Sequence, residues 1–331
     1  FMDDYTFVDA LTGSVVSFDY QTGDARMRAG SDAEVAEARA CTSLFFPGCS
    51  FINYAMPLVS AVYDTLRQGG AVDGVSVLCC GKILSYEPDG ERVRAGFEAQ
   101  LRDHLAQSNI TRIVAACPNC VKALRAALTG DERVANIEIV ALPQVLADMG
   151  YKVDRDTVAL LVKGDASADV LLCPHDSCPD RDTGEFADGL RALLPEGIYA
   201  EPEHNRKRSI CCGSLPRAAG KFEAADKCAR TNGEEAAAVG ADALVMACMS
   251  CVFQLNMAQR SVQAVHVLEL LYSWRVDWSN VGAWMKLRFL FDETLGVVEE
   301  ESSGRAFAGL GGGAAGAGTS TRAASVDGGA A

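Results

Sequence analysis

A cysteine pattern that occurs twice limits what this chain can fold into more than any other feature of its sequence. Each copy has a single cysteine, then a Cys-Cys-Gly triplet, then a Cys-x-x-Cys pair. The ten cysteines are Cys49, Cys79, Cys80, Cys117 and Cys120 in the first copy and Cys178, Cys211, Cys212, Cys248 and Cys251 in the second. Corresponding cysteines are 129 to 132 residues apart, which predicts a duplicated metal-binding domain.

The length and charge of the chain exclude several classes of protein. A chain of 331 residues can form two domains that each bury their own core, so it does not need disulfides. The formal net charge of −14 argues against nucleic-acid binding, because the phosphates would repel the protein. We expect no signal peptide, because Asp3, Asp4 and Asp9 interrupt the start of the chain. We also expect no transmembrane segment, because no apolar run reaches about 18 residues.

The expected location is the cytoplasm, with attachment to a membrane surface through a partner as the alternative. In this reducing compartment, clustered thiols bind metals or carry out redox chemistry more often than they form structural disulfides. The cysteine count therefore predicts metal or redox chemistry.

Short apolar runs alternate with longer segments of helical periodicity from residue 43 onward, which is typical of parallel α/β units. The predicted strands are residues 43–49, 75–80, 112–117, 137–142, 170–173, 209–212, 243–248 and 263–267. The predicted helices are residues 56–68, 91–107, 121–128 and 218–239. This pattern predicts an α/β fold with two tandem, duplicated Rossmann-like domains and mostly parallel sheets. The cysteines fall at the C-terminal ends of strands, where open α/β sheets bind ligands.

The same elements predict the domain organisation. An N-terminal appendage, residues 1–40, contains a hairpin that turns at Thr22-Gly23. The first cysteine-rich domain is 41–150 and the second is 151–275. An amphipathic helix is predicted over 276–300, and the Gly/Ala/Ser-rich tail 301–331 is predicted to be disordered.

The adjacent cysteines give the strongest indication of which kind of metal centre the chain binds. A Cys-x-x-Cys pair alone is compatible with zinc, a redox dithiol or an iron–sulfur cluster. Successive side chains of an extended strand point to opposite faces, so Cys79 and Cys80 reach one centre only where the backbone turns sharply. Gly81 and Gly213 supply that turn, because glycine accepts a positive φ without steric cost. Each copy offers five thiols where a structural zinc needs four, which favours an iron–sulfur cluster.

Further local matches accompany the cysteine pattern, at residues 45–50, 116–120, 175–181 and 204–206. On these residues, and over roughly residues 43–275, the chain resembles the cysteine-rich CCG domain proteins typified by the CCG-domain subunit of heterodisulfide reductase. The resemblance implies that the five cysteines of each domain hold a [4Fe-4S] cluster of the noncubane type, so that the chain binds two clusters.

The resemblance also implies an oxidoreductase that cleaves a small disulfide or related thiol-linked substrate between the two clusters. No G-x-G-x-x-G sequence follows a predicted strand, so we expect the electrons to come from a partner subunit, ferredoxin-like or a flavoprotein. Relatives also serve as iron–sulfur subunits of flavin-dependent glycolate, lactate and glycerol-3-phosphate dehydrogenases. An electron-relay subunit of that kind is the first alternative. A non-enzymatic zinc or redox-sensing module is the second.

Outside the pattern, the candidate catalytic residues are His175, His204, Arg206 and Lys82. His204, Arg206 and Lys82 are taken as groups that interact electrostatically with the substrate or the clusters. His175 is a candidate to donate a hydrogen bond to a cluster sulfur or a proton to a product thiolate, because histidine titrates near neutral pH, and the alternative is that it caps its own turn.

Three further cysteines lie outside the pattern. Cys173 is a candidate to replace Cys178 as a ligand, whereas Cys41 and Cys228 are expected to be structural thiols. Many relatives have further glycines after the second Cys-Cys-Gly, but this chain has Ser214-Leu215-Pro216-Arg217. We therefore expect an altered substrate pocket beside the second cluster.

Overall fold

The computed structural model describes residues 4–19, 25–86 and 89–276. The predicted turn at Thr22-Gly23, the predicted helix after residue 276 and the predicted tail 301–331 lie outside these residues. Within the described residues, no helix combines the length and the apolar character needed to cross a lipid bilayer.

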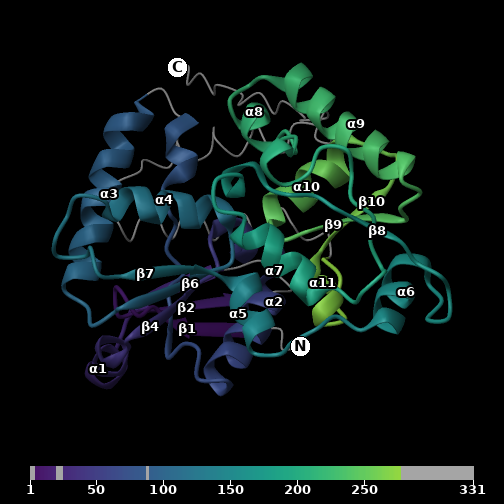
Figure 1. Cartoon of the computed structure of the whole chain (residues 1–331). Helices are drawn as coiled ribbons and strands as arrows, with labels where there is room; N and C mark the ends of the chain where they lie inside the picture. Colours follow the sequence, from purple (N-terminus) through teal and green to yellow (C-terminus); the bar gives the residue numbers. More distant parts are fainter. Residues whose placement is uncertain (1–3, 20–24, 87–88, 277–331) are drawn as a thin grey trace, which may run out of the picture.

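A parallel sheet of four strands, in the order β5-β4-β6-β7, forms the centre of the first half. Its strands are β4 (Ser43–Phe46), β5 (Gly74–Val75), β6 (Arg112–Ala115) and β7 (Glu138–Ala141). The helical elements of this half are α2 (Cys49–Gln68), the 3-10 helix η1 (Lys82–Tyr86), α3 (Gly90–Ala106), α4 (Pro118–Leu128) and α5 (Leu142–Asp148). Figure 1 shows the sheet on the left, below α3 and α4. The strands are mainly apolar because helices cover a parallel sheet on both faces.

A second parallel sheet, in the order β10-β9-β8, forms the centre of the second half. Its strands are β8 (Leu172–Pro174), β9 (Ala243–Met246) and β10 (Gln263–His266). The helical elements are α6 (Arg155–Lys163), η2 (Cys178–Asp180), α7 (Glu185–Leu193), η3 (Arg206–Arg208), α8 (Ser214–Ala218), α9 (Phe222–Ala238), α10 (Met249–Ala258) and α11 (Val267–Leu271). A single parallel bridge joins Leu172 to Tyr199, so Tyr199 stands where β5 stands in the first half. Both halves therefore have the same strand order, which confirms the predicted duplicated α/β fold.

The two Cys-Cys-Gly triplets differ from the prediction, because neither lies in a strand. The first lies in the loop after Val75, where β5 ends. The second was predicted to end a strand over residues 209–212, and this is wrong. The free edge of β8 is already paired with the segment around Tyr199, through bonds from Leu172 N to Ile198 O and from Ala200 N to Leu172 O. Residues 209–212 consequently have no strand to pair with.

The N-terminal residues form an antiparallel sheet that packs on the first half. It consists of β1 (Asp4–Val8), β2 (Ser14–Asp19) and β3 (Ala25–Ala29), followed by α1 (Asp32–Ala40). Tyr5, Phe7 and Phe18 are buried in the main hydrophobic core. The buried carboxylate of Asp9 accepts hydrogen bonds from Ser76 Oγ and from Val77 N, both at 2.8 Å. The sheet therefore holds the loop that leads to Cys79 and Cys80.

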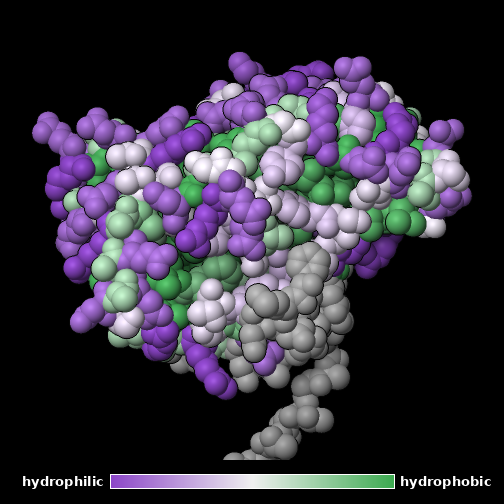
Figure 2. Space-filling view, turned by 90° about the horizontal axis from the view of Figure 1, so that it is seen from below, coloured by the Kyte–Doolittle hydropathy of each residue, from purple (hydrophilic) through white to green (hydrophobic). Residues whose placement is uncertain are grey.

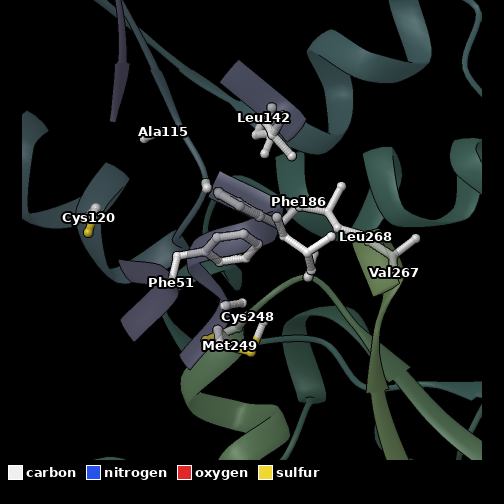
Figure 3. Packing of buried hydrophobic residues seen from close by; sticks show 14 of the residues in the cluster. Phe51, Ala115, Cys120, Leu142, Phe186, Cys248, Met249, Val267 and Leu268 are labelled. Carbon is white, nitrogen blue, oxygen red and sulfur yellow. The ribbon is translucent and has the colours of Figure 1, made fainter. Parts of the chain in front are cut away.

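The two halves share one hydrophobic core. Figure 3 shows Phe51 and Leu142 of the first half in the same cluster as Phe186, Cys248 and Leu268 of the second. Outside this core, hydrophilic residues occupy most of the outline of the face in Figure 2, and hydrophobic residues are visible in patches between them.

Helices α5 and α7 pack against each other across the two halves. A Cβ atom at residue 189 would lie 2.6 Å from Gln144 N, so glycine at this position permits the close approach. The cysteine-bearing loops of the two halves are therefore held in a fixed relation by packing, and no disulfide links them, since every cysteine in the described residues is a free thiol.

Candidate metal centre

Four cysteines lie where a parallel strand gives way to a helix. Cys49 begins α2 after β4, and Cys178 begins η2 after β8. Cys117 is the N-cap residue of α4 after β6, and Cys248 is the N-cap residue of α10 after β9. Because parallel strands present their carboxyl ends at one edge of a sheet, each fold brings its cysteines together there.

The structure brings the five cysteines of the first half into contact. The thiols of Cys49 and Cys79 are hydrogen-bonded, and so are those of Cys80 and Cys120. Cys117 and Cys120, one helical turn apart, are hydrogen-bonded as well. Cys80 and Cys120 are buried and the other three are half-buried. We define these residues as the first cysteine set.

The second half repeats this arrangement with its own five cysteines, which we define as the second cysteine set. The Sγ atoms of Cys178 and Cys211 lie 3.8 Å apart. The thiol of Cys251 is hydrogen-bonded to those of Cys212 and Cys248. Equivalent residues make equivalent contacts in the two sets, as expected for a duplicated domain.

The two sets meet at Cys117 and Cys248, whose thiols are hydrogen-bonded to each other. These cysteines occupy the same position in the two copies, and a contact between equivalent residues is what a two-fold relation between the halves produces. Ser50, which follows Cys49, and Ser250, which lies between Cys248 and Cys251, also meet across the halves with their Oγ atoms 2.6 Å apart.

Glycines shape the backbone around both sets. Gly81 and Gly213 have φ angles of 72° and 99°, which are positive as the sequence predicts. In each triplet the glycine N–H donates to the thiol two residues earlier, Cys79 or Cys211, over 3.4 Å. Gly48 also has a positive φ, of 79°, and a Cβ there would lie 2.8 Å from the Sγ of Cys120.

Contacts among the thiols change their acidity. Hydrogen bonds from Cys120 and Cys79 lower the pKa of Cys80 to about 6. Hydrogen bonds from Cys178 and Cys212 likewise lower the pKa of Cys211. Since the thiolate is the form that binds metal, each set contains a thiol suited to act as a ligand at neutral pH.

His175 lies beside the second cysteine set. Its side chain is buried, and its Nδ1 is 2.8 Å from Asn232 Oδ1. A ring nitrogen of His175 and the Sγ atoms of Cys212 and Cys251 all lie within 4.8 Å of one another. Burial lowers the pKa of His175, so the ring is neutral at pH 7.

The other three candidate residues do not share one site. Lys82 lines a pocket together with Cys49 and Cys80. His204 is instead bound to Glu235, with Nδ1 at 2.5 Å from Oε1. Arg206 is paired with Asp188, at 2.5 Å, in a separate cavity of about 400 Å³ that is also lined by Ser177 and Arg181 beside Cys178.

The three cysteines outside the pattern lie in different surroundings, and Cys228 is half-buried on helix α9. The thiol of Cys41 faces the carbonyl oxygens of Glu37 and Asp73, each at 3.5 Å. Cys173 is fully buried in strand β8, and burial raises its pKa to about 12. A buried thiol with a raised pKa is a poor candidate for a metal ligand. The replacement of Cys178 by Cys173 as a ligand therefore stays a prediction, and the surroundings of Cys173 do not favour it.

A pocket lies between the two halves, next to the first cysteine set. Its wall includes Cys49, Cys80, Cys117 and Cys120, and the second half contributes Ser214, Leu215, Ala218 and Ser250. The segment that departs from the glycine-rich sequence of relatives therefore lines a pocket beside the first set, and it also contacts the second set, since Ser214 N donates to the Sγ of Cys212 over 3.4 Å. The expectation that it alters a pocket beside the second set stays a prediction.

The residues around the two sets fit an iron–sulfur group. Thiolates are soft ligands of the kind that such clusters require, and each set supplies five in contact with one another. Asn53 on α2 and Gln254 on α10 are fully buried, yet their side-chain amides have no hydrogen-bond partner among the described residues. Buried unpaired polar groups are costly, and Asn53 and Gln254 lie on the two helices that begin at or just after pattern cysteines, Cys49 and Cys248.

The sequence did not indicate Asn232 or Asp9 as residues of this region, and Ser50 and Ser250 stand out in it only as neighbours of pattern cysteines. Asn232 and Asp9 act through contacts that are distant in the sequence.

The chain matches the profile of the cysteine-rich domain (CCG) family twice, over residues 43–125 and 174–256. Each match contains all five cysteines of one set. The chain therefore belongs to the cysteine-rich domain (CCG) family, whose members are typical iron–sulfur proteins and occur as subunits of iron–sulfur oxidoreductases.

No curated protein sequence matches the chain. Two solved structures have distant similarity. Glutamate racemase isoform RacE1 from Bacillus anthracis is 10% identical, with 79% of this chain and 85% of that chain covered and a TM-score of 0.32. Picrophilus torridus aspartate racemase is 12% identical, with 78% and 100% covered and a TM-score of 0.31. Similarity this distant gives no information about which reaction, if any, the chain catalyses.

Proposed function

We propose that this chain is an iron–sulfur oxidoreductase subunit, similar to the CCG-domain subunit of heterodisulfide reductase, that reduces a disulfide or a related thiol-linked substrate. The observation that supports this most is the contact between Cys117 and Cys248, which joins two complete cysteine sets at a pseudo-two-fold axis. Reductive cleavage of a disulfide takes two electrons and yields two thiolates, so a doubled centre suits this reaction.

Each cysteine set would hold one [4Fe-4S] cluster, of the noncubane type known in the family. Two clusters held in this way would supply the two electrons that cleavage of a disulfide needs, one for each sulfur atom of the substrate. Burial of Cys80, Cys120, Cys212, Cys248 and Cys251 excludes water from both centres, which protects reduced iron and sulfur from side reactions.

The pocket between the halves is the proposed entry for the substrate. Its wall carries cysteines of the first set, so a substrate sulfur there lies next to one centre and close to the other. The Lys82 ammonium in the same wall would stabilise the negative charge that a thiolate product develops. Leu215 narrows this pocket in place of the glycine of relatives, and would favour a small substrate over a bulky one.

Electrons would come from a partner subunit, either ferredoxin-like or a flavoprotein. The electron-relay alternative, as a subunit of a flavin-dependent dehydrogenase, uses the same clusters and differs only in the last acceptor. The reaction of the reduced protein with a disulfide distinguishes the two functions. A disulfide reductase cleaves the disulfide, whereas an electron-relay subunit passes its electrons to a partner and leaves the disulfide intact.

The test is anaerobic turnover. Protein purified without oxygen and reduced chemically is mixed with a panel of small disulfides, and the thiols released are measured. We expect release of two thiols per disulfide, and loss of release in both Cys80→Ser and Cys212→Ser but not in Cys41→Ser. If the protein carries iron but cleaves no disulfide in the panel, the relay function replaces this proposal.

A further inference from the structure

The hydrogen bonds of Asn232 define the tautomer of His175. Both amide hydrogens of Asn232 are used, because Nδ2 lies 3.1 Å from the carbonyl oxygen of Cys211 and 2.8 Å from that of Cys228. Its Oδ1 must then act as an acceptor toward His175 Nδ1, 2.8 Å away. The proton of the neutral imidazole is therefore on Nδ1.

That tautomer leaves the other ring nitrogen, Nε2, with a free lone pair. His175 is 4% exposed, and Nε2 has no hydrogen-bond partner among the described residues. An unpaired acceptor at this depth is costly unless something binds it. One ring nitrogen of His175 and the Sγ atoms of Cys212 and Cys251 lie within 4.8 Å of one another. Since Nδ1 is already bound to Asn232, Nε2 is the nitrogen whose lone pair is free to bind a metal.

The arrangement of these atoms matches a known way of holding a metal-binding histidine. Metal-ligating imidazoles usually donate their other N–H to a carbonyl or carboxylate, which fixes the ring and its tautomer. The side-chain oxygen of Asn232 does so here. Its amide group is in turn held by the carbonyl oxygen of Cys211, which is itself a member of the second cysteine set.

The first half has no counterpart of this imidazole. When the two copies are aligned on Cys49 and Cys178, the residue three positions before the cysteine is Phe46 in the first and His175 in the second. The side chain of Phe46 is fully buried and has no polar atom. Any nitrogen ligand of this type is thus confined to the second set.

We propose that Nε2 of His175 is a ligand of the metal centre held by the second cysteine set, so that the two centres of the chain differ in their ligands. This inference rests on the proposed function only in that the cysteines bind a metal. It does not depend on the disulfide substrate, and it applies to zinc as well as to an iron–sulfur cluster.

The test uses the whole chain, purified anaerobically with its metal and labelled with ¹⁵N in the histidine imidazoles alone. The reduced protein is studied by pulsed EPR, which detects nitrogen bound to a paramagnetic iron centre. We expect a ¹⁵N coupling on one of two cluster signals, lost in His175→Gln and kept in His204→Gln, which alters a histidine bound to Glu235 instead. The wild-type measurement stands even if His175→Gln does not fold.

The outcomes separate the two proposals. Iron present with no ¹⁵N coupling in the wild type overturns the inference and leaves the proposed function intact, and so does a coupling that persists in His175→Gln. A colourless zinc protein overturns the proposed function. X-ray absorption at the zinc edge then decides the inference, since a nitrogen neighbour lost in His175→Gln supports it and sulfur neighbours alone overturn it.

Discussion

The thiols of Cys117 and Cys248 are hydrogen-bonded to each other, and each is the first cysteine of the Cys-x-x-Cys pair in its own half. Each is also the N-cap residue of the helix that carries its pair, α4 or α10. The contact therefore aligns two equivalent strand-to-helix turns, and it brings two metal-binding sets together without any covalent link. Under the proposed function, two centres this close would act on one substrate.

Replacing one member of each adjacent pair tests which thiols hold metal. We expect Cys80→Ser to lose the metal of the first set and Cys212→Ser that of the second, because each of these buried thiols contacts another member of its set. Each variant should keep about half of the wild-type metal content, since each set forms one of two centres. Metal analysis and visible absorption measure this. Cys41→Ser is the control and should keep all of the metal, whereas an equal loss there would contradict the assignment.

The turn before Cys49 should tolerate no side chain. In Gly48→Ala the new methyl group would meet the Sγ of Cys120 at 2.8 Å, in a backbone with a φ of 79°. Gly130→Ala is a matched control, because its φ is 84° but nothing lies within 4 Å of the new Cβ. The control should cost about 1 kcal/mol from backbone strain alone. Gly48→Ala should cost about 1 to 3 kcal/mol more and should lose metal from the first set, because the methyl group overpacks against Cys120 and because the ψ of 155° at Gly48 adds backbone strain. Equal effects in chemical denaturation would show that the contact with Cys120 is unimportant.

The N-terminal sheet should stabilise the loop that carries the first Cys-Cys-Gly. Asp9→Ala removes an acceptor for Ser76 Oγ and Val77 N in a buried site, and should lower the free energy of unfolding by about 3 kcal/mol. Urea denaturation measures the change. Asp165→Ala removes an exposed carboxylate that accepts a hydrogen bond from Ser167, and should lower the free energy of unfolding far less than Asp9→Ala does. If both variants have the same stability as the wild type, the sheet does not hold this loop.

The stability of the protein should fall between pH 7 and pH 5 because of His266. Burial lowers the pKa of this side chain to about 3, whereas an unfolded histidine titrates near 6.5. Below about pH 6.5 the unfolded chain binds the proton that the folded protein does not, so the free energy of unfolding should fall by about 1.4 kcal/mol for each pH unit.

A variant isolates this effect. His266 caps helix α11 by accepting from Leu268 N, and asparagine can make the same cap without titrating. His266→Asn should therefore flatten the pH dependence of the free energy of unfolding by about 1.4 kcal/mol for each pH unit. A wild-type slope that is unchanged in His266→Asn would assign the pH dependence to other groups.

Much of the fold could be predicted because the sequence signals are local. The alternation of apolar runs and helical segments indicated the parallel sheets, and the two cysteine copies indicated the duplication. The predicted strand at 209–212 failed because it depends on which segment pairs with β8, and the residues around Tyr199 pair there instead. A competition between segments for one sheet edge is a tertiary effect that propensity does not contain.

The candidate site was also predictable only in the features that depend on neighbouring residues in the sequence. Gly81 and Gly213 have the positive φ that adjacent cysteines require, because the backbone geometry of two neighbouring residues is a local matter. The contact between Cys117 and Cys248, the partner of His175 and the role of Leu215 in the pocket wall depend on how the halves pack. No spacing in the sequence encodes that packing directly.

The central claim is that the two cysteine sets hold iron–sulfur clusters. The direct measurement is the iron, sulfide and zinc content of anaerobically purified protein, together with its visible spectrum. We predict a brown protein with about eight iron atoms and about eight sulfides per chain, as two four-iron clusters require. A colourless protein with stoichiometric zinc and no sulfide would contradict the claim.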